Sequence, residues 1–127
     1  MKLSDEQVKS FKELGYVFIE NVFDAEEVEI MNNELPKMYS LDREEVQKEK
    51  DGKAIRTVFA AHTFSDIYSN LSRHPRIIEP AKQLLEGDVY IHQFKINAKE
   101  AFDGDLWQWH QDYGTWKNDD EMPEGLA

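Results

Sequence analysis

The sequence predicts an α+β fold, in which helices are followed by a small number of strands. Two capping boxes, Ser4 with Gln7 and Asp24 with Glu27, each precede apolar residues at helical spacing. Residues 88–99 instead alternate between apolar and polar, which is typical of a strand. With 127 residues and no repeat or linker, we expect a single partial domain, helical and mixed over residues 1–87 and strand-rich over 88–127.

The first elements are predicted to be a helix, a strand and a second helix. The first helix follows Ser4 and runs until Gly15 stops it. Residues 16–19 are aromatic and β-branched, which favours a strand. The second helix follows Asp24, and Pro36 is expected to end it.

The middle of the chain begins with a charged stretch. Residues 41–52 are predicted to be a solvated helix or a mobile loop at the surface. Residues 54–60 favour a strand and residues 64–71 a helix. An apolar stripe then predicts a further amphipathic helix that begins at Pro75 and stops at Gly87.

The strand predicted over residues 88–99 has two faces of different character. Its apolar parity contains Tyr90, His92, Phe94 and Ile96, and its other parity ends in Gln93, Lys95 and Asn97. An ordinary amphipathic strand would turn that second face to water. Alternatively, these polar groups line a cavity that binds an anionic cosubstrate. The pattern alone leaves both interpretations open.

The last predicted strand carries an imidazole and a carboxylate, His110 and Asp112, two residues apart. Alternate residues of a strand share a face, so both groups would point the same way. They make up two thirds of the facial triad that holds non-haem Fe(II). Residues 113–127 contain no histidine that would complete it. If this strand pairs antiparallel with residues 88–99, then Gln93, Lys95 and Asn97 share its ligand-bearing face.

The composition excludes several classes of function. A net charge of -11 and a pI near 4.7 argue against nucleic acid and anionic membranes as partners. The chain has no cysteine, which excludes disulfides and thiolate chemistry and is compatible with a cytoplasmic location. No signal peptide, membrane span, phosphate-binding loop or nucleophile elbow is expected.

The remaining histidines are weaker metal ligands, because none has a partner at ligand spacing. His62 and His74 suit a cap or a surface position, and His92 lies on the apolar parity of its strand. Aromatic residues flank His110 and Asp112, either as the wall of a small-molecule pocket or simply as core. They are Trp107, Trp109, Tyr113 and Trp116.

Three stretches together resemble the phytanoyl-CoA dioxygenase family, especially its ectoine-hydroxylase-like branch. They are Tyr90-Ile91-His92-Gln93-Phe94-Lys95-Ile96-Asn97, the run from Trp107 to Trp116, and Asp119-Asp120-Glu121-Met122-Pro123. The opening, with Gly15-Tyr16-Val17-Phe18-Ile19-Glu20 and then Phe23-Asp24, is similar to that family as well. The resemblance covers only the N-terminal half of the family's domain.

The resemblance implies part of a double-stranded β-helix, or jelly roll, that holds Fe(II) and 2-oxoglutarate. His110 and Asp112 match the first two iron ligands, and Gln93 and Asn97 match residues that line the 2-oxoglutarate site. Trp116 matches an aromatic residue of the pocket. Lys95 stands where the ectoine-type pattern favours arginine, so it keeps the charge but gives up a planar fork for a carboxylate.

The activity implied is hydroxylation of a small-molecule substrate with O2. The acid at Asp112 favours hydroxylation over halogenation, since related halogenases have a small residue there. The distal histidine and the basic residue for the far carboxylate of 2-oxoglutarate have no counterpart, so we expect an incomplete chain that is inactive in isolation. Two alternatives stay open: a non-catalytic binding or assembly module of the same fold, and a cupin-like metal enzyme that does not use 2-oxoglutarate. Exposed strand edges would favour self-association.

Overall fold

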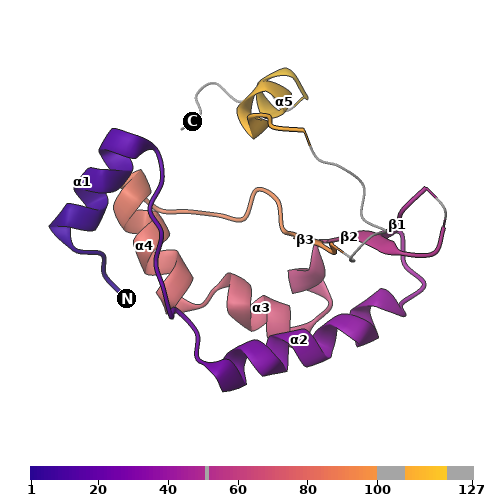
Figure 1. The fold of residues 1–127 in the computed structure, drawn as a ribbon. Helices are drawn as coiled ribbons and strands as arrows, with labels where there is room; N and C mark the ends of the chain where they lie inside the picture. The colour runs from indigo at the N-terminus through magenta and orange to yellow at the C-terminus, as the bar shows by residue number, and fades with distance from the viewer. Residues whose placement is uncertain (51, 100–107, 120–127) are drawn as a thin grey trace. The chain divides into compact units, whose positions relative to one another are not determined.

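The computed structural model describes residues 1–50, 52–99 and 108–119, and it confirms an α+β fold with helices and a small antiparallel sheet (Figure 1). The chain forms two compact units, each described here by itself. The first comprises residues 1–3 and 19–105, and the second comprises residues 4–18 and 106–127. The predicted division at residues 87 and 88 stays a prediction.

Three α-helices of the first unit are α2 (Ala25–Tyr39), α3 (Asp66–Ser72) and α4 (Pro75–Leu85). The predicted capping box of α2 is present, because Asp24 accepts from the backbone of Glu27 and the Glu27 carboxylate accepts from the backbone of Asp24. Pro75 occupies the first turn of α4, where its missing N–H costs nothing. Local capping chemistry therefore sets the starts of these helices.

Two predicted helix ends are wrong. Helix α2 continues through Pro36 to Tyr39, because the last turn buries Met38 to 2% exposure in the core. Packing of that turn outweighs the hydrogen bond that the proline cannot make. At the end of α4 the left-handed residue is Glu86, with φ 56°, and not Gly87. The Glu86 N–H still closes the helix onto the Lys82 carbonyl.

The sheet has the order β1-β2-β3, with β1 (Val46–Lys48), β2 (Ile55–Phe59) and β3 (Lys95–Asn97) all antiparallel. Strand β2 confirms the strand predicted over residues 54–60. Strand β1 shows that the prediction of a helix or loop over residues 41–52 is wrong for residues 46–48. This edge strand has one apolar residue among charged and polar ones, and it forms because β2 pairs with it through backbone hydrogen bonds. Only Lys95–Asn97 of the predicted strand over residues 88–99 pairs with a neighbour, and residues 88–94 are irregular.

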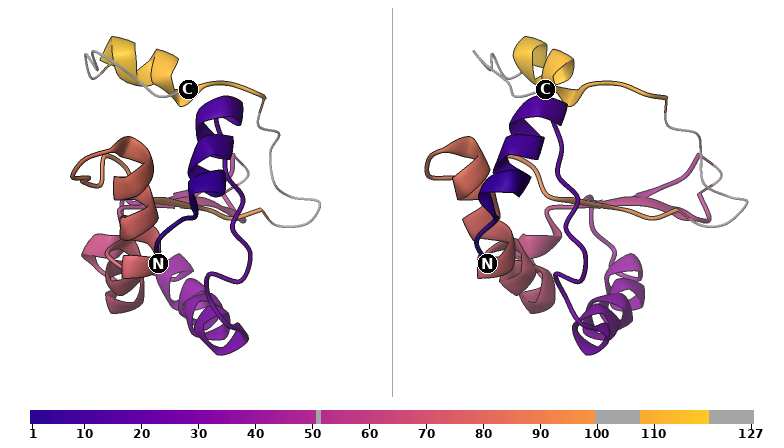
Figure 2. Two further views of the ribbon diagram at one scale, coloured as in Figure 1. Left: turned by 90° about the vertical axis from the view of Figure 1, so that its left-hand side faces the viewer. Right: turned by 60° about the vertical axis from the view of Figure 1, so that its left-hand side comes forward.

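One face of the sheet packs against helices. Val58 is fully buried at the centre of a cluster with Met38, Ile55, Ala61 and Tyr68. Three views show α2 and α3 on the same side of the sheet (Figures 1 and 2). A short 3-10 helix, η1 (Ala61–Thr63), joins β2 to α3. Side chains of β3 that alternate away from this core are therefore free to form a site on the other face.

The second unit contains α1 (Asp5–Leu14) and α5 (Asp112–Asp119). Helix α1 has the predicted Ser4 and Gln7 capping box and ends at Gly15, with φ 80°. The strand predicted over residues 16–19 is not formed, because Tyr16 and Phe18 are exposed and the segment pairs with no described strand. In the described part of the chain, no helix is long and apolar enough to cross a bilayer.

Candidate functional site

The segment with His110 and Asp112 is not a strand in the described residues. Residues 108–111 are irregular, and Asp112 is the first residue of α5. Residues 100–107, which include Trp107, lie outside the described residues. The predicted antiparallel pairing with residues 88–99 would join residues of the two units, and it stays a prediction.

The two side chains nevertheless converge. The Nε2 atom of His110 lies 3.1 Å from the Oδ1 atom of Asp112. The other ring nitrogen, Nδ1, lies 2.7 Å from the backbone carbonyl of Gln108. The irregular chain before α5 thus brings together the two side chains whose convergence strand alternation had predicted.

The contact with Gln108 assigns the protons of the imidazole ring. A carbonyl oxygen only accepts, so Nδ1 of His110 must donate, and a neutral ring then carries its lone pair on Nε2. That lone pair faces a carboxylate oxygen of Asp112, and two acceptors at this separation repel each other unless a cation lies between them. A proton on Nε2 or a metal ion meets that requirement. Orientation of a ligating histidine by a backbone carbonyl is also common at metal sites.

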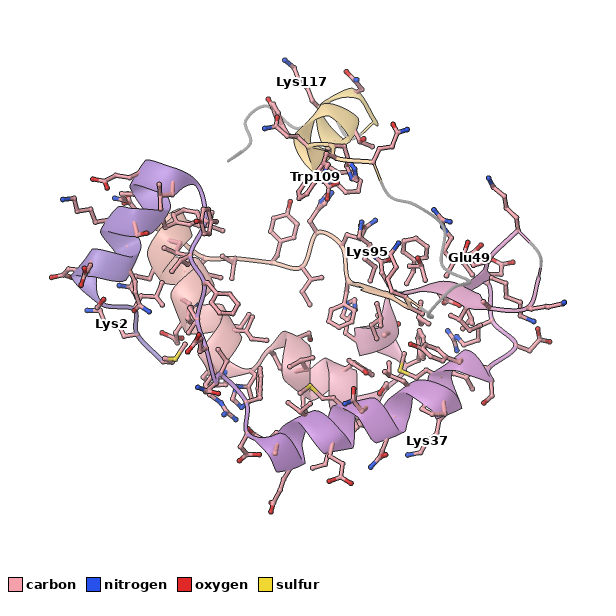
Figure 3. The ribbon with its side chains drawn as sticks, viewed as in Figure 1. Lys2, Lys37, Glu49, Lys95, Trp109 and Lys117 are labelled. Carbon is pink, nitrogen blue, oxygen red and sulfur yellow. The ribbon has the colours of Figure 1, made fainter. Side chains whose placement is uncertain are left out.

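The pair is accessible and forms the wall of an open hollow. The side chains of His110 and Asp112 are 56% and 53% exposed. With Gln108 and Trp109 they line a hollow of about 550 Å³. Trp109, whose side chain is labelled in Figure 3, precedes α5. It is fully exposed. Of the aromatic residues predicted around the pair, Trp109 lines the hollow.

Two further aromatic residues lie on α5. Tyr113 and Trp116 are half-buried. The ammonium group of Lys117 lies 6.0 Å from the centre of the Tyr113 ring, at the outer limit of a cation–π contact. Trp116 was predicted to line the pocket, and it is not among the residues that surround the hollow. Its role stays a prediction.

A third metal ligand is not provided by the described residues. Within residues 1–50, 52–99 and 108–119, no group of three or more His, Asp or Glu side chains converges. The other histidines have different surroundings. His74 caps α4 by accepting from the Arg76 N–H at 3.2 Å, as the sequence suggested. His62 is part-buried against the Phe94 ring at 5.1 Å, and His92 is exposed.

The predicted cosubstrate residues lie on and beside β3, in the first unit. Lys95 and Asn97 are exposed on one face of the strand, while Ile96 between them packs against the core. Gln93 is exposed just before the strand. The predicted alternation is therefore confirmed for Lys95, Ile96 and Asn97, and it is not tested for Gln93, which precedes the strand. The other predicted site residues, His110, Asp112 and Trp116, belong to the second unit.

Thr57 contacts one of the predicted site residues, and the sequence did not predict this contact. It stands opposite Asn97 in the register of β2 and β3, and its hydroxyl donates to Asn97 Oδ1 at 2.9 Å. The sequence does contain a signal for Thr57, because the strand predicted over residues 54–60 places a threonine hydroxyl among apolar residues. Its partner Asn97 could not be predicted, because the pairing of residues 40 positions apart is not determined by local sequence.

The family model for "Phytanoyl-CoA dioxygenase (PhyH)" matches residues 11–126. The chain therefore belongs to the phytanoyl-CoA dioxygenase family. Ectoine dioxygenase of Bordetella parapertussis is 38% identical over 129 residues, which cover 98% of this chain and 42% of the relative. L-proline trans-4-hydroxylase of Streptomyces griseoviridis is 41% identical over 80 residues, which cover 63% of this chain and 30% of the relative.

Solved structures agree with this assignment. The crystal structure of EctD from S. alaskensis with 2-oxoglutarate and 5-hydroxyectoine matches with a TM-score of 0.88 and 33% identity, over 98% of this chain and 45% of that one. The structure of EctD from S. alaskensis with bound Fe matches with a TM-score of 0.81 over 90% of this chain and 42% of that one, also at 33% identity. The chain thus spans about two fifths of the length of the relatives it matches.

Proposed function

We propose that this chain supplies part of the active site of an Fe(II)- and 2-oxoglutarate-dependent dioxygenase that hydroxylates a small molecule. The observation that carries the proposal is the convergence of His110 Nε2 and Asp112 Oδ1, with Nδ1 of the same ring engaged by Gln108. Membership of the family and the similarity to EctD structures with Fe and with 2-oxoglutarate support it.

In this proposal His110 and Asp112 are two of the protein ligands of the iron. An imidazole nitrogen and a carboxylate oxygen on one side of the metal leave other positions open for the cosubstrate and O2. Bound iron, with 2-oxoglutarate and O2, supplies the oxidation of an unactivated carbon. The carboxylate of Asp112 would be a ligand of the iron, and its presence favours hydroxylation over halogenation. Trp116 stays, within this proposal, an aromatic residue of the substrate pocket.

The cosubstrate residues of the proposal are Gln93, Lys95 and Asn97. The amides of Gln93 and Asn97 offer N–H donors to carboxylate oxygens, and the ammonium group of Lys95 offers a positive charge. Exposure of Lys95 and Asn97 on the face of β3 opposite the core suits such a role. We propose further that the sheet is part of a jelly roll, as the family resemblance implies.

The substrate class we propose is a small molecule of the kind that the names of the relatives describe. Those names specify ectoine and L-proline, both far smaller than a protein or a nucleic acid. The net charge of -11 also opposes binding to nucleic acid. The absence of cysteine supports, within this proposal, a cytoplasmic protein.

The direct test is titration with Mn(II), an oxygen-stable substitute for Fe(II), followed by the electron paramagnetic resonance signal of the free ion. We expect the parent chain to bind Mn(II), and His110→Ala and Asp112→Ala each to weaken binding at least about tenfold. His92→Ala is the matched control, since it removes an exposed histidine outside the pair. Equal binding by His110→Ala and the parent would reject the metal site.

A second candidate function is a non-catalytic binding or assembly module. It is favoured by the finding that His110 and Asp112 are joined by no third ligand in the described residues. No measurable binding of Mn(II) or 2-oxoglutarate by the parent chain would support it. The cupin-like alternative predicts metal binding without 2-oxoglutarate, so loss of 2-oxoglutarate binding in Asn97→Ala would count against it.

We also propose self-association through apolar surface and strand edges. Strands β1 and β3 form the edges of the sheet in the described residues. Among the large apolar side chains, Phe18 is 78% and Tyr90 is 82% exposed. Exposed apolar groups and unpaired strand edges each favour contact with another chain.

A further inference from the structure

The polar face of the sheet carries a hydrogen bond between strands that orients one proposed cosubstrate residue. Asn97 on β3 stands opposite Thr57 on β2. The Thr57 hydroxyl donates to Asn97 Oδ1 at 2.9 Å. Thr57 is only 3% exposed, whereas Asn97 is exposed. The bond therefore joins a buried hydroxyl to an amide that reaches solvent.

The two ends of the Asn97 amide have opposite chemistry. Its carbonyl oxygen only accepts hydrogen bonds, and its NH2 group only donates them. Because Thr57 engages the carbonyl oxygen, the NH2 group is directed elsewhere and presents its donors to an acceptor. A ligand carboxylate is such an acceptor, and hydrogen bonds to charged oxygens are among the stronger ones.

A second side chain on the same face of β3 carries a positive charge, which complements a carboxylate. Lys95 lies two residues before Asn97 on β3 and stands opposite Phe59 of β2. Alternate residues of a strand share a face, so Lys95 and Asn97 project from the same side. A carboxylate near the Asn97 amide would therefore also meet the positive charge of Lys95.

We propose that Thr57 is a positioning residue for the cosubstrate, because its hydroxyl selects the amide orientation in which Asn97 offers N–H donors to a carboxylate. The inference rests on the proposed function, since it takes the ligand to be a dicarboxylate of the 2-oxoglutarate class. Without the hydroxyl, the amide is free to rotate and to turn its carbonyl oxygen toward the anion, which repels it. We expect about a five- to tenfold loss of affinity.

The test follows the asparagine side-chain NH2 signals by two-dimensional NMR of the 127-residue chain, during titration with 2-oxoglutarate in the presence of diamagnetic Zn(II). Asn97→Ala identifies the Asn97 signals. Thr57→Val removes the hydroxyl at similar volume, and Thr57→Ser keeps it. Thr63→Val is the matched control, because it removes a threonine hydroxyl that donates to the Ala60 carbonyl at an exposed position.

The expected result has two parts. Before ligand is added, the Asn97 NH2 signals of Thr57→Val move toward those of a freely rotating amide, while Thr57→Ser and Thr63→Val keep the parent positions. On titration, Thr57→Val binds 2-oxoglutarate five to ten times more weakly, and Thr57→Ser restores binding. Asn97→Asp keeps an acceptor for Thr57 but has no NH2 donors, so it is expected to bind more weakly than Thr57→Val.

Other outcomes separate this inference from the proposed function. If Asn97→Ala binds more weakly but Thr57→Val binds like the parent, the positioning role is overturned and the cosubstrate site stands. If Thr57→Ser loses as much affinity as Thr57→Val, the hydroxyl is not the cause, and the inference is again overturned. If Asn97→Ala and the parent bind equally, or neither binds, the cosubstrate site itself is rejected and the inference with it.

Discussion

At the scale of single residues, Tyr68 connects two helices through one hydroxyl. Its O–H donates to the Met31 carbonyl at 3.0 Å, and the residue is only 5% exposed. Tyr68→Phe keeps the ring in the core but leaves the carbonyl without that donor. We expect a loss of about 1 kcal/mol in the free energy of unfolding at neutral pH, measured by urea denaturation.

The same hydroxyl makes stability depend on alkaline pH. Burial is the main reason that the pKa of Tyr68 rises from its ordinary value of 10.0 to about 12, with smaller contributions from Tyr39 and Glu34. The folded state therefore holds the proton more tightly than the unfolded state does. This contribution to stability is complete below about pH 10 and is lost as the pH rises toward about 12. Tyr68→Phe should flatten the stability curve over that interval, and an unchanged slope would contradict the assignment.

Glu27 makes the free energy of unfolding depend on pH in the acid range, where stability falls as the pH falls. The Arg76 guanidinium, which donates to the Glu27 carboxylate, is the main cause that lowers the pKa of this carboxylate below its ordinary value of 4.5. The resulting stability is present above pH 4.5 and is lost as the pH falls through the lowered pKa. Glu27→Gln should therefore be less stable than the parent at pH 7, with the difference shrinking in acid. Glu26→Gln is the control for charge in the same turn, and a constant difference for Glu27→Gln would contradict the prediction.

At the scale of elements, replacing two different helix glycines by alanine should change the free energy of unfolding in opposite directions. Gly114 lies within α5, and a Cβ atom there would meet nothing within 4 Å. Gly114→Ala should stabilise the helix by about 0.5 to 1 kcal/mol. Gly15 ends α1 with φ 80°, so Gly15→Ala should destabilise that end by about 1 kcal/mol. Circular dichroism and urea denaturation of both variants check the prediction, and a loss of helix in Gly114→Ala would contradict it.

The starts of α1, α2 and α4 were predictable from the sequence, whereas the start of α5 was not and the strands were predictable only in part. The capping boxes at Ser4 and Asp24 involve residues three apart, so local sequence determines them. Strand β1 was missed because its stability comes from pairing with β2, and Val46 is its only apolar residue. The end of α2 was misplaced for a related reason, since burial of Met38 is a tertiary effect.

The candidate site was predictable as a set of side chains but not as a geometry. The spacing of His110 and Asp112 predicted convergence, yet the backbone that brings them together is an irregular segment and the first residue of α5 rather than a strand. The parity of Lys95 and Asn97 was correct because alternation is a property of the strand itself. The partner of Asn97 was missed because sequence gives no register between β2 and β3.

At the scale of the whole molecule, net charge and exposed apolar surface oppose each other. The chain carries a net charge of -11, which keeps copies apart at low ionic strength. Tyr90 and Trp109 nevertheless expose 82% and 103% of their reference areas, which favours association. At about 1 M salt the screening length falls to roughly 3 Å, so charge repulsion is largely removed while apolar attraction remains.

Sedimentation of the 14.9 kDa chain should therefore show monomers at low salt and larger species at high salt. Tyr90→Ser removes exposed apolar area without altering the net charge, so it should reduce association at high salt. Thr63→Ser is a control that changes the surface without removing an aromatic ring. A mass that does not change with salt in the parent would reject self-association through apolar surface. Equal association by Tyr90→Ser and the parent would instead place the contact elsewhere, because only the area around Tyr90 differs between them.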